Sequence, residues 1–327
     1  MDLSTAVDAT SCEPGSIIYP LCASIYGYAP SLAWNALFLS IFAVSTLAHL
    51  AQGVYYRMWT FIIAMCIGGL CEVIGEIGRL ALHKDPLSDS GFKLQLAFLT
   101  FAPAFLAAGI YLNLKHLVLT FGTSFSRMRP AWYTWFFISC DIFSLALQGA
   151  GGAVAAMANP TDPGPGGKNM FDTGNKLMNS GIIVQVVTLV LFGVLSVEFA
   201  VRVWRGSHLL SGEAAGLSRS LRLKTFLGAL GLAYVVILIR CCYRVAELSG
   251  GWGNEIMSDE ALFVGLDSTM VAIAMISLNL FHPGSVFGKR TRKGRVAKMA
   301  SNDPADRSSA IELKGDRLSE RFQVEKA

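Results

Sequence analysis

The stretch LMNSGIIVQVVTLVLFGVLSVEFAVRV, residues 177–203, is apolar over almost its whole length. About 20 apolar residues in a helix cross the roughly 30 Å of hydrocarbon in a bilayer, so this stretch predicts a transmembrane helix. Six further stretches resemble it in length and composition. The seven predicted spans are Ser31–Ala51, Met58–Leu80, Leu94–Leu114, Ala131–Ala156, Leu177–Val203, Phe226–Ala246 and Glu260–Phe281.

The composition of the 327-residue chain agrees with a membrane protein. Hydrophobic residues make up 53% and charged residues 15%, with a mean hydropathy of +0.49, whereas soluble domains average about 25% charged residues. The apolar residues form continuous runs and lack the alternation of a membrane β-barrel. We therefore predict an all-α polytopic protein with an extracellular tail (1–30), a seven-helix membrane domain (31–284) and a disordered cytosolic tail (285–327).

Lys and Arg predict the orientation of the bundle. The first 30 residues hold neither Lys nor Arg and no apolar run, so they do not form a cleaved signal peptide. With the N-terminus outside, the inner segments hold fifteen Lys and Arg and the outer segments five. The positive-inside rule then favours N-out and C-in. The formal net charge of +4 reflects this inner surface, and we expect no nucleic-acid partner.

Two details of the tails stay open at this stage. Cys12 and Cys22 fall in the predicted outer tail, an oxidising environment, where they either form a disulfide or remain free. The basic stretch GKRTRKGRVAK, residues 288–298, either only retains the inner orientation or also contacts anionic lipid head groups.

Charged residues inside the spans are the main functional signal. Arg240, Arg244 and Glu247 are spaced i, i+4, i+7 and share one helix face. The second span carries an opposite triplet at the same spacing, formed by Glu72, Glu76 and Arg79. Both helices run in the same direction in the predicted topology. If they are neighbours, the expected pairs are Glu72 with Arg240, Glu76 with Arg244, and Arg79 with Glu247.

Each unpaired charge at mid-membrane costs about 2.5–3.5 kcal/mol on insertion scales, so pairing or water contact is close to required. Two interpretations fit the triplets and can coexist, namely a structural clasp of ion pairs and a polar ligand or proton site. Other polar residues in the spans fit a ligand site. Asp141, Ser144 and Gln148 share a face of the fourth span, and Asp267 lies in the seventh.

Several motifs together resemble the fungal RTA-like family of lipid-translocating exporters. They are YAPSLAWNALF, EVIGEIGR, FAPAFLAAGIY, DIFSLALQGAGG, GIIVQ, RCCYRVAELSGGWGNEIMSDEALFVGLD and HPG, in this order between Tyr28 and Gly284. Two residues depart from the family pattern. Glu76 replaces a usual Tyr, and Val264 replaces a common aromatic residue before Asp267.

The resemblance implies export or flipping of sphingoid long-chain bases, resistance to toxic amphiphiles and a place in the plasma membrane; one relative is linked to porphyrin uptake. Such a base has a cationic amine, hydroxyls and an alkyl tail. Glu72, Glu76, Asp141 and Asp267 are expected to neutralise the amine, and Gln148 to contact the hydroxyls. Ser144 is expected in the same substrate site. Arg79, Arg240, Arg244 and Glu247 are expected to form structural ion pairs.

A seven-helix receptor or sensor is the alternative, since the topology fits it equally well. The sequence has no phosphate-binding loop, no zinc-ligand spacing and no Lys in the seventh span for a retinal Schiff base. We therefore expect a non-enzyme without a cofactor or metal. Any uphill transport would need an ion gradient or another protein. The oligomeric state does not follow from the sequence.

Overall fold

The computed structural model describes residues 26–122, 126, 130–157, 165–206, 216–218, 220–250 and 254–287. Within these ranges, seven helices are long and apolar enough to cross a membrane, which confirms the predicted helical class and the seven spans. Cys12 and Cys22, whose pairing the sequence leaves open, and the basic stretch 288–298 lie outside the described residues.

Each predicted span falls on one helix or, for the seventh, on three consecutive helical segments. The elements are α2 (Leu32–Tyr56), α3 (Trp59–Lys84), α4 (Asp89–Phe121), α5 (Pro130–Met157), α6 (Pro165–Arg205), α8 (Leu221–Ser249), α9 (Glu260–Phe263), the π-helical turn η4 (Val264–Ser268) and α10 (Thr269–Leu280). Most are longer than the apolar runs that predicted them, because a helix can continue into polar residues beyond the hydrocarbon.

Local sequence signals fix several helix ends. The hydroxyl groups of Ser88 and Ser220 accept hydrogen bonds from backbone N–H groups in the first turns of α4 and α8. The carboxylate of Asp259 does the same for α9. These side chains satisfy donors that a helix start leaves without partners. Arg57 ends α2 in a left-handed conformation (φ 56°), and the resulting tight turn leads directly into α3.

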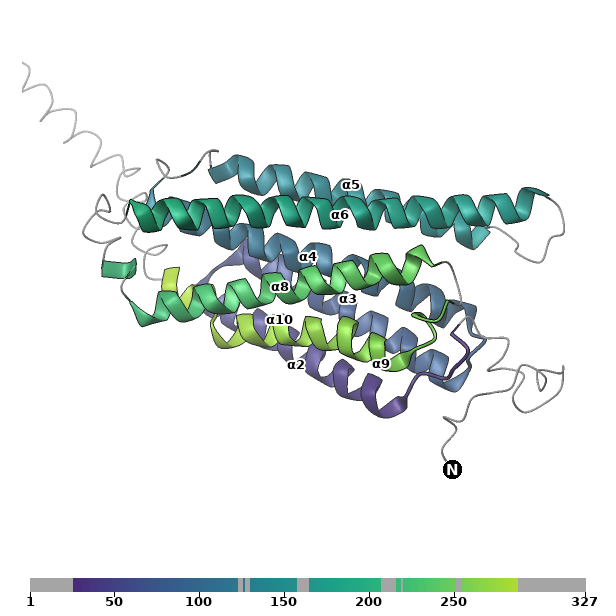
Figure 1. Ribbon diagram of the computed structural model, residues 1–327. Helices are drawn as coiled ribbons and strands as arrows, with labels where there is room; N and C mark the ends of the chain where they lie inside the picture. The colour runs from purple at the N-terminus through teal and green to yellow at the C-terminus, as the bar shows by residue number, and fades with distance from the viewer. Residues whose placement is uncertain are drawn as a thin grey trace, which may run out of the picture.

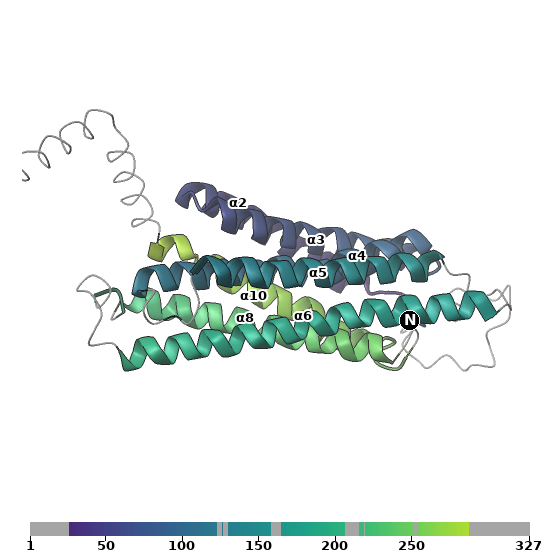
Figure 2. The same ribbon diagram turned by 90° about the horizontal axis from the view of Figure 1, so that it is seen from above.

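The helices form two groups that pack along their lengths (Figures 1 and 2). In the larger group α4 packs on α3, α3 packs on α2, and α10 packs on both α2 and α8. In the smaller group α5 and α6 run side by side, and α5 contacts α4 while α6 contacts α8. The α5–α6 pair therefore joins the remaining helices along a seam with α4 and α8.

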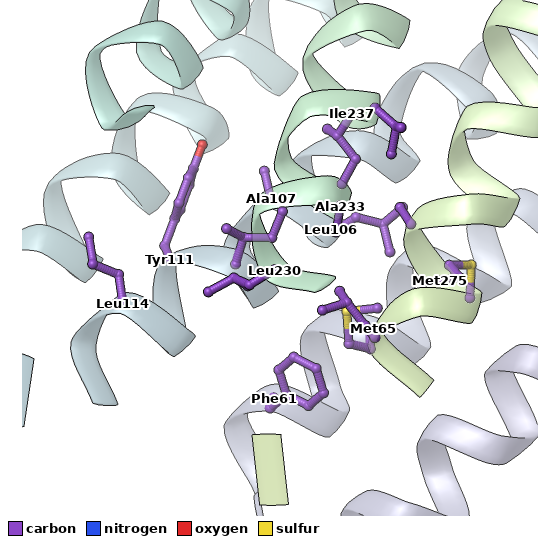
Figure 3. Close-up of a cluster of buried hydrophobic side chains, with 14 of the residues drawn as sticks. Phe61, Met65, Leu106, Ala107, Tyr111, Leu114, Leu230, Ala233, Ile237 and Met275 are labelled. Atoms are coloured by element: carbon purple, nitrogen blue, oxygen red, sulfur yellow. The ribbon is translucent and has the colours of Figure 1, made fainter. Parts of the chain in front are cut away.

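Apolar side chains of α3, α4, α8 and α10 fill the centre of the larger group (Figure 3). Phe61, Met65, Leu106, Ile237 and Met275 belong to this core and are almost completely buried. The outer faces of the bundle carry many exposed large apolar side chains on α2, α5 and α6. That distribution suits helices whose outer surface contacts lipid.

Candidate functional site

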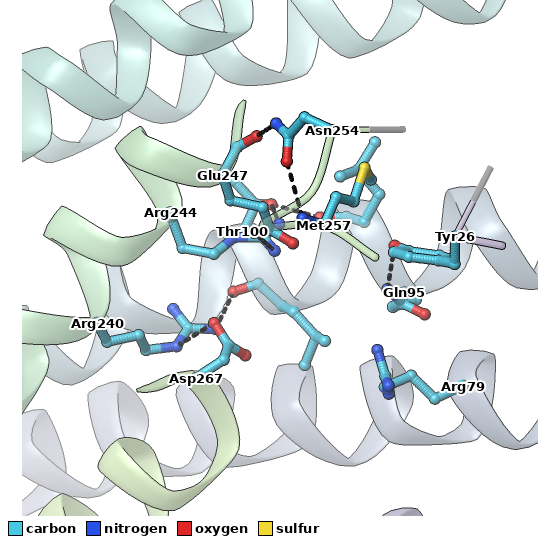
Figure 4. A network of polar contacts seen from close by, with 12 residues as sticks. Tyr26, Arg79, Gln95, Thr100, Arg240, Arg244, Glu247, Asn254, Met257 and Asp267 are labelled. Atoms are coloured by element: carbon cyan, nitrogen blue, oxygen red, sulfur yellow. Dashed lines mark hydrogen bonds and ion pairs between the residues drawn. The ribbon is translucent and has the colours of Figure 1, made fainter. Parts of the chain in front are cut away.

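A network of buried polar side chains links α3, α4, α8 and η4 (Figure 4). It contains three arginines, Arg79, Arg240 and Arg244, each at most 4% exposed. A guanidinium group keeps its charge at any physiological pH, so each of the three must find acceptors inside the protein.

Arg240 binds acceptors from three different elements. Its Nη2 donates to the carbonyl oxygen of Leu99 at 2.6 Å. Pro103 lies four residues later in α4 and has no N–H, so this carbonyl has no i+4 donor within the helix. The guanidinium also contacts the carboxylate of Asp267 at 3.1 and 3.3 Å and that of Glu72 at 3.5 Å. The expected contact between Glu72 and Arg240 is therefore present, but Asp267 shares the arginine.

The expected contact between Glu76 and Arg244 is wrong. Arg244 Nη1 forms an ion pair with Glu247, three residues later on the same helix, and Nη2 donates to Thr100 Oγ1 at 3.1 Å. The reason is that α8 packs mainly on α10, whereas α3 packs on α4 and α2. The two triplets do not face each other residue by residue.

The expected contact between Arg79 and Glu247 is also wrong. Arg79 Nε donates to Asn35 Oδ1 at 2.7 Å, and Nη2 donates to the Tyr28 hydroxyl at 3.4 Å. The same nitrogen lies 3.7 Å from Glu260 Oε1 at the start of α9. Arg79 thus ties α3 to α2, to the segment before α2 and to α9.

Glu76 forms no ion pair with any residue in the described part of the chain. Its Oε1 accepts a hydrogen bond from Ser268 Oγ at 3.1 Å, and its Oε2 has no hydrogen-bond partner among the described residues. Ser268 and Asp267 both lie on η4, and short π-helical segments of this kind are often found at functional sites. Through this turn the seventh span contacts both Glu76 on α3 and Arg240 on α8.

The buried charges do not balance. Among the described residues, five buried carboxyl groups stand against three buried guanidinium groups. The carboxyl groups are Glu72, Glu76, Asp141, Glu247 and Asp267. Of these, Glu72, Glu247 and Asp267 lie in ion pairs. Glu76 and Asp141 form no ion pair within the part of the chain that the structure describes.

Asp141 lies outside the network, on α5 at the seam with α4 and α8. It is 3% exposed, and neither carboxyl oxygen has a hydrogen-bond partner among the described residues. The hydroxyl of Tyr111 on α4 faces it without a hydrogen bond of ordinary geometry. The ring of Tyr111 contacts Phe137 and Phe192, with centroids 5.4 and 4.4 Å away. A polar pair thus sits against an aromatic cluster.

Ser144 and Gln148, the other two residues on that face, mainly join α5 to α6. Ser144 Oγ donates to the carbonyl oxygen of Gly181 at 2.6 Å. Gln148 Nε2 donates to Gln185 Oε1 at 3.0 Å and to Ser144 Oγ at 2.7 Å. A Cβ atom at Gly181 would lie 2.7 Å from Gln148 Cγ, so glycine permits this close approach. Gln148 Oε1 and Gln185 Nε2 have no hydrogen-bond partner among the described residues.

Sequence reasoning missed the roles of Tyr111 and Ser268, because neither residue is charged. A tyrosine or serine in an apolar span gives no sign of whether it faces lipid or a buried carboxyl group. The carbonyl group of Leu99 could have been identified from the sequence as an acceptor without a helical donor, because a proline at i+4 always removes that donor. The substrate contacts expected for Glu72, Glu76, Asp141, Ser144, Gln148 and Asp267 stay predictions.

Most of this chain is similar in sequence to known proteins. The family model described as "RTA1 like protein" matches residues 65–290. The sphingoid long-chain base transporter RSB1 of Saccharomyces cerevisiae is 33% identical over 318 residues, which cover 87% of this chain and 81% of that protein. Protoporphyrin uptake protein 1 of the same species is 29% identical over 223 residues, with 68% and 67% covered.

A third relative, Protein RTM1 of Saccharomyces cerevisiae, is 27% identical over 228 residues, which cover 69% of this chain and 67% of that protein. No solved structure matches the chain.

Proposed function

We propose that this chain, which belongs to the RTA1-like family, moves a cationic amphiphilic lipid between the leaflets of the plasma membrane. The substrate class is a sphingoid long-chain base. The observation that carries the proposal is the unpaired, buried carboxyl group of Asp141, placed where lipid would otherwise exclude a charge. The name of the relative RSB1 supports the choice of substrate class.

The groups around Asp141 suit the head group of such a base. An ammonium group at Asp141 would form a charge-assisted hydrogen bond of the kind that is strong in a low dielectric. The Tyr111 hydroxyl, which faces Asp141, and Gln148 Oε1, which has no hydrogen-bond partner among the described residues, would contact substrate hydroxyls. The alkyl tail would stay in lipid along the seam of the α5–α6 pair.

The other acidic residues take lesser parts in this proposal. Glu72 and Asp267 share the single positive charge of Arg240, and Ser144 is committed to Gly181. We assign Asp141 as the primary amine contact. Glu76, the other carboxyl group without an ion pair, remains available along a transport path.

Transport of a labelled base by the purified protein in liposomes tests the function. We expect the protein to accelerate the movement of phytosphingosine between leaflets. It should not move ceramide, because N-acylation removes the ammonium group. Equal acceleration of both lipids would contradict recognition of the amine.

The receptor alternative makes a different prediction in the same preparation. A sensor would leave lipid movement unchanged and would instead recruit a cytosolic protein when the base binds. Absence of transport together with ligand-dependent recruitment would overturn the transporter proposal. In cells, loss of the gene should sensitise growth to added phytosphingosine, and overexpression should protect.

We also propose that the N-terminus lies outside and the C-terminus in the cytosol, on the basis of the Lys and Arg distribution. The chain has no N-x-Ser/Thr acceptor of its own with a residue other than proline at x, so engineered acceptors report without background. Acceptors placed in 157–176 should be glycosylated, and those in 205–222 should not. The reverse pattern would overturn the orientation.

A further inference from the structure

Glu76 is the buried carboxyl group of the network that forms no ion pair among the described residues. It is 0% exposed, and among the described residues its only hydrogen bond comes from Ser268 Oγ at 3.1 Å. Its second oxygen has no partner among the described residues. An isolated carboxylate in a low dielectric is so costly that such a group takes up a proton or binds a cation.

The two arginines that face Glu76 are bound to other groups, so they do not supply the positive charge that a carboxylate at this position would need. Asp267 and Ser268 face it from η4, Arg240 from α8, and Arg79 from its own helix, together with Glu72 one turn earlier. Arg240 already contacts the carboxylates of Glu72 and Asp267. Arg79 is bound to groups on other elements.

A proton fits this position better than a metal ion. Within the described part of the chain, no three His, Cys, Asp or Glu side chains are grouped so that they could hold a metal. A proton needs only one carboxyl oxygen. The hydrogen bond from Ser268 occupies Oε1, which leaves Oε2 to carry the proton.

Polar side chains lie between Glu76 and the end of the bundle. Arg79 lies three residues further along α3 and contacts Glu260 at 3.7 Å. The Glu260 side chain is 26% exposed, so it can exchange protons with water. On the other side, Arg240 contacts Asp267 beside Ser268, and the next residue, Cys241, lies within reach of the charge of Asp141. A short part of α8 thus separates the two surplus carboxyl groups.

We propose that Glu76 is a proton-binding site, protonated in this structure, and that its proton is exchanged for the ammonium of the substrate during transport. The coupling rests on the proposed function, whereas the proton site does not. One proton entering for each ammonium leaving keeps the net charge of the membrane interior unchanged. The proton gradient would then supply the energy for export.

Infrared spectroscopy of the full-length protein in lipid tests the proton site without any transport. A protonated carboxyl group in an apolar setting gives its own C=O band. We expect Glu76→Gln to remove one such band at neutral pH, while retaining the hydrogen bond to Ser268. Glu198→Gln is the matched control, because Glu198 pairs with Arg202 on α6 and should contribute no such band.

A spectrum that loses no band in Glu76→Gln would overturn the proton site, and so would a band that disappears only in Glu72→Gln. Asp141→Asn, measured in parallel, identifies any band that belongs to the other surplus carboxyl group. These outcomes are independent of whether the protein transports a lipid.

Liposomes with a pH gradient test the coupling. A trimethylated sphingoid base keeps its charge at every pH, so the gradient cannot act on the substrate itself. Because this base has no N–H to donate to Asp141, phytosphingosine transport is measured in parallel, and protein-free liposomes report leakage. We expect the gradient to accelerate transport by the wild type and to have no effect on Glu76→Gln. Acceleration that persists in Glu76→Gln would overturn the coupling. Absence of any lipid movement at any pH would instead contradict the proposed function.

Discussion

The polar network around Arg240 and the seam of the α5–α6 pair bury polar groups in opposite ways. In the network, three guanidinium groups bind carboxylates, a free carbonyl and hydroxyl groups across several elements. The α5–α6 contact uses glycines and neutral hydrogen bonds between Ser144, Gln148 and Gln185. Only at its seam with α4 does a carboxyl group, Asp141, remain without a partner among the described residues.

The two arrangements indicate where a ligand can act in this bundle. A charge that already has a buried partner gains little from binding a substrate, and separating such a pair is expensive. A carboxyl group without a partner gains from any cation that reaches it. We therefore regard the network mainly as the part that holds the larger helix group together. The seam of the α5–α6 pair with α4 and α8 is the part where a carboxyl group binds and releases a substrate cation.

Arg240→Gln should cause the largest loss of stability. It leaves Glu72 and Asp267 buried without a cation, and removing one partner of a buried pair typically costs about 3–5 kcal/mol. We expect little folded protein in the membrane and a lowered Tm in lipid nanodiscs. Recovery of wild-type amounts at the wild-type Tm would contradict the central role of this arginine.

Glu72→Gln is the matched control for that loss. Asp267 still neutralises Arg240 through contacts of 3.1 and 3.3 Å, so the loss in Tm should be clearly smaller. For the same reason, the charge swap Glu72→Arg with Arg240→Glu should not restore stability, because a carboxylate at position 240 would face Asp267. Full rescue by the swap would show that Glu72 and Arg240 act as an isolated pair.

Gly174→Ala should cause the next largest effect, by separating α5 from α6. A Cβ atom at position 174 would lie 2.5 Å from the backbone nitrogen of Ala155, and overpacking of this kind costs about 1–3 kcal/mol. Gly152→Ala on α5 is the control, because nothing lies within 4 Å of its Cβ position. The control should keep or slightly raise Tm through better helix propensity. Equal changes in the two variants would refute close packing of the pair.

Ser144→Ala should have a smaller effect, since it removes neutral hydrogen bonds only. Ser144 Oγ donates to the Gly181 carbonyl and accepts from Gln148. Interhelical hydrogen bonds in membranes average about 0.6 kcal/mol, with a maximum near 1.7. We expect a small decrease in Tm with transport retained. A loss of transport at unchanged Tm would place Ser144 in the substrate site after all.

The seven spans could be predicted because hydrocarbon thickness imposes a length on every apolar run. The apolar run Leu94–Leu114 lies inside the longer helix Asp89–Phe121. Composition shows which residues lie in the hydrocarbon of the membrane, but it does not show where the helix begins and ends. The resemblance to the RTA-like family, carried by motifs such as DIFSLALQGAGG, is confirmed by the family match. Glu72 and Arg240 were paired correctly because their spacing placed them on matching faces.

The remaining pairs could not be predicted, because spacing tells which face a residue occupies and not which helix lies opposite. Arg244 forms an ion pair with Glu247 on its own helix, and the i, i+3 spacing permits this pair as well as one between helices. The π-helical turn brought Asp267 to Arg240, and no residue pattern in VGLDS announces that turn. Tertiary packing decided both outcomes.

Asp141→Asn should have the smallest effect on stability and the largest on transport. The change removes a buried carboxyl group that has no partner among the described residues, so Tm should stay the same or rise. Transport of phytosphingosine should be abolished, since a neutral amide cannot neutralise an ammonium group. Tyr111→Phe should weaken transport but not abolish it, because it removes one hydroxyl and keeps the ring against Phe137 and Phe192. A variant Asp141→Asn that still transports at the wild-type rate would remove this residue from the mechanism. A large drop in its Tm would show that Asp141 stabilises the seam, and the contrast between the two regions would then disappear.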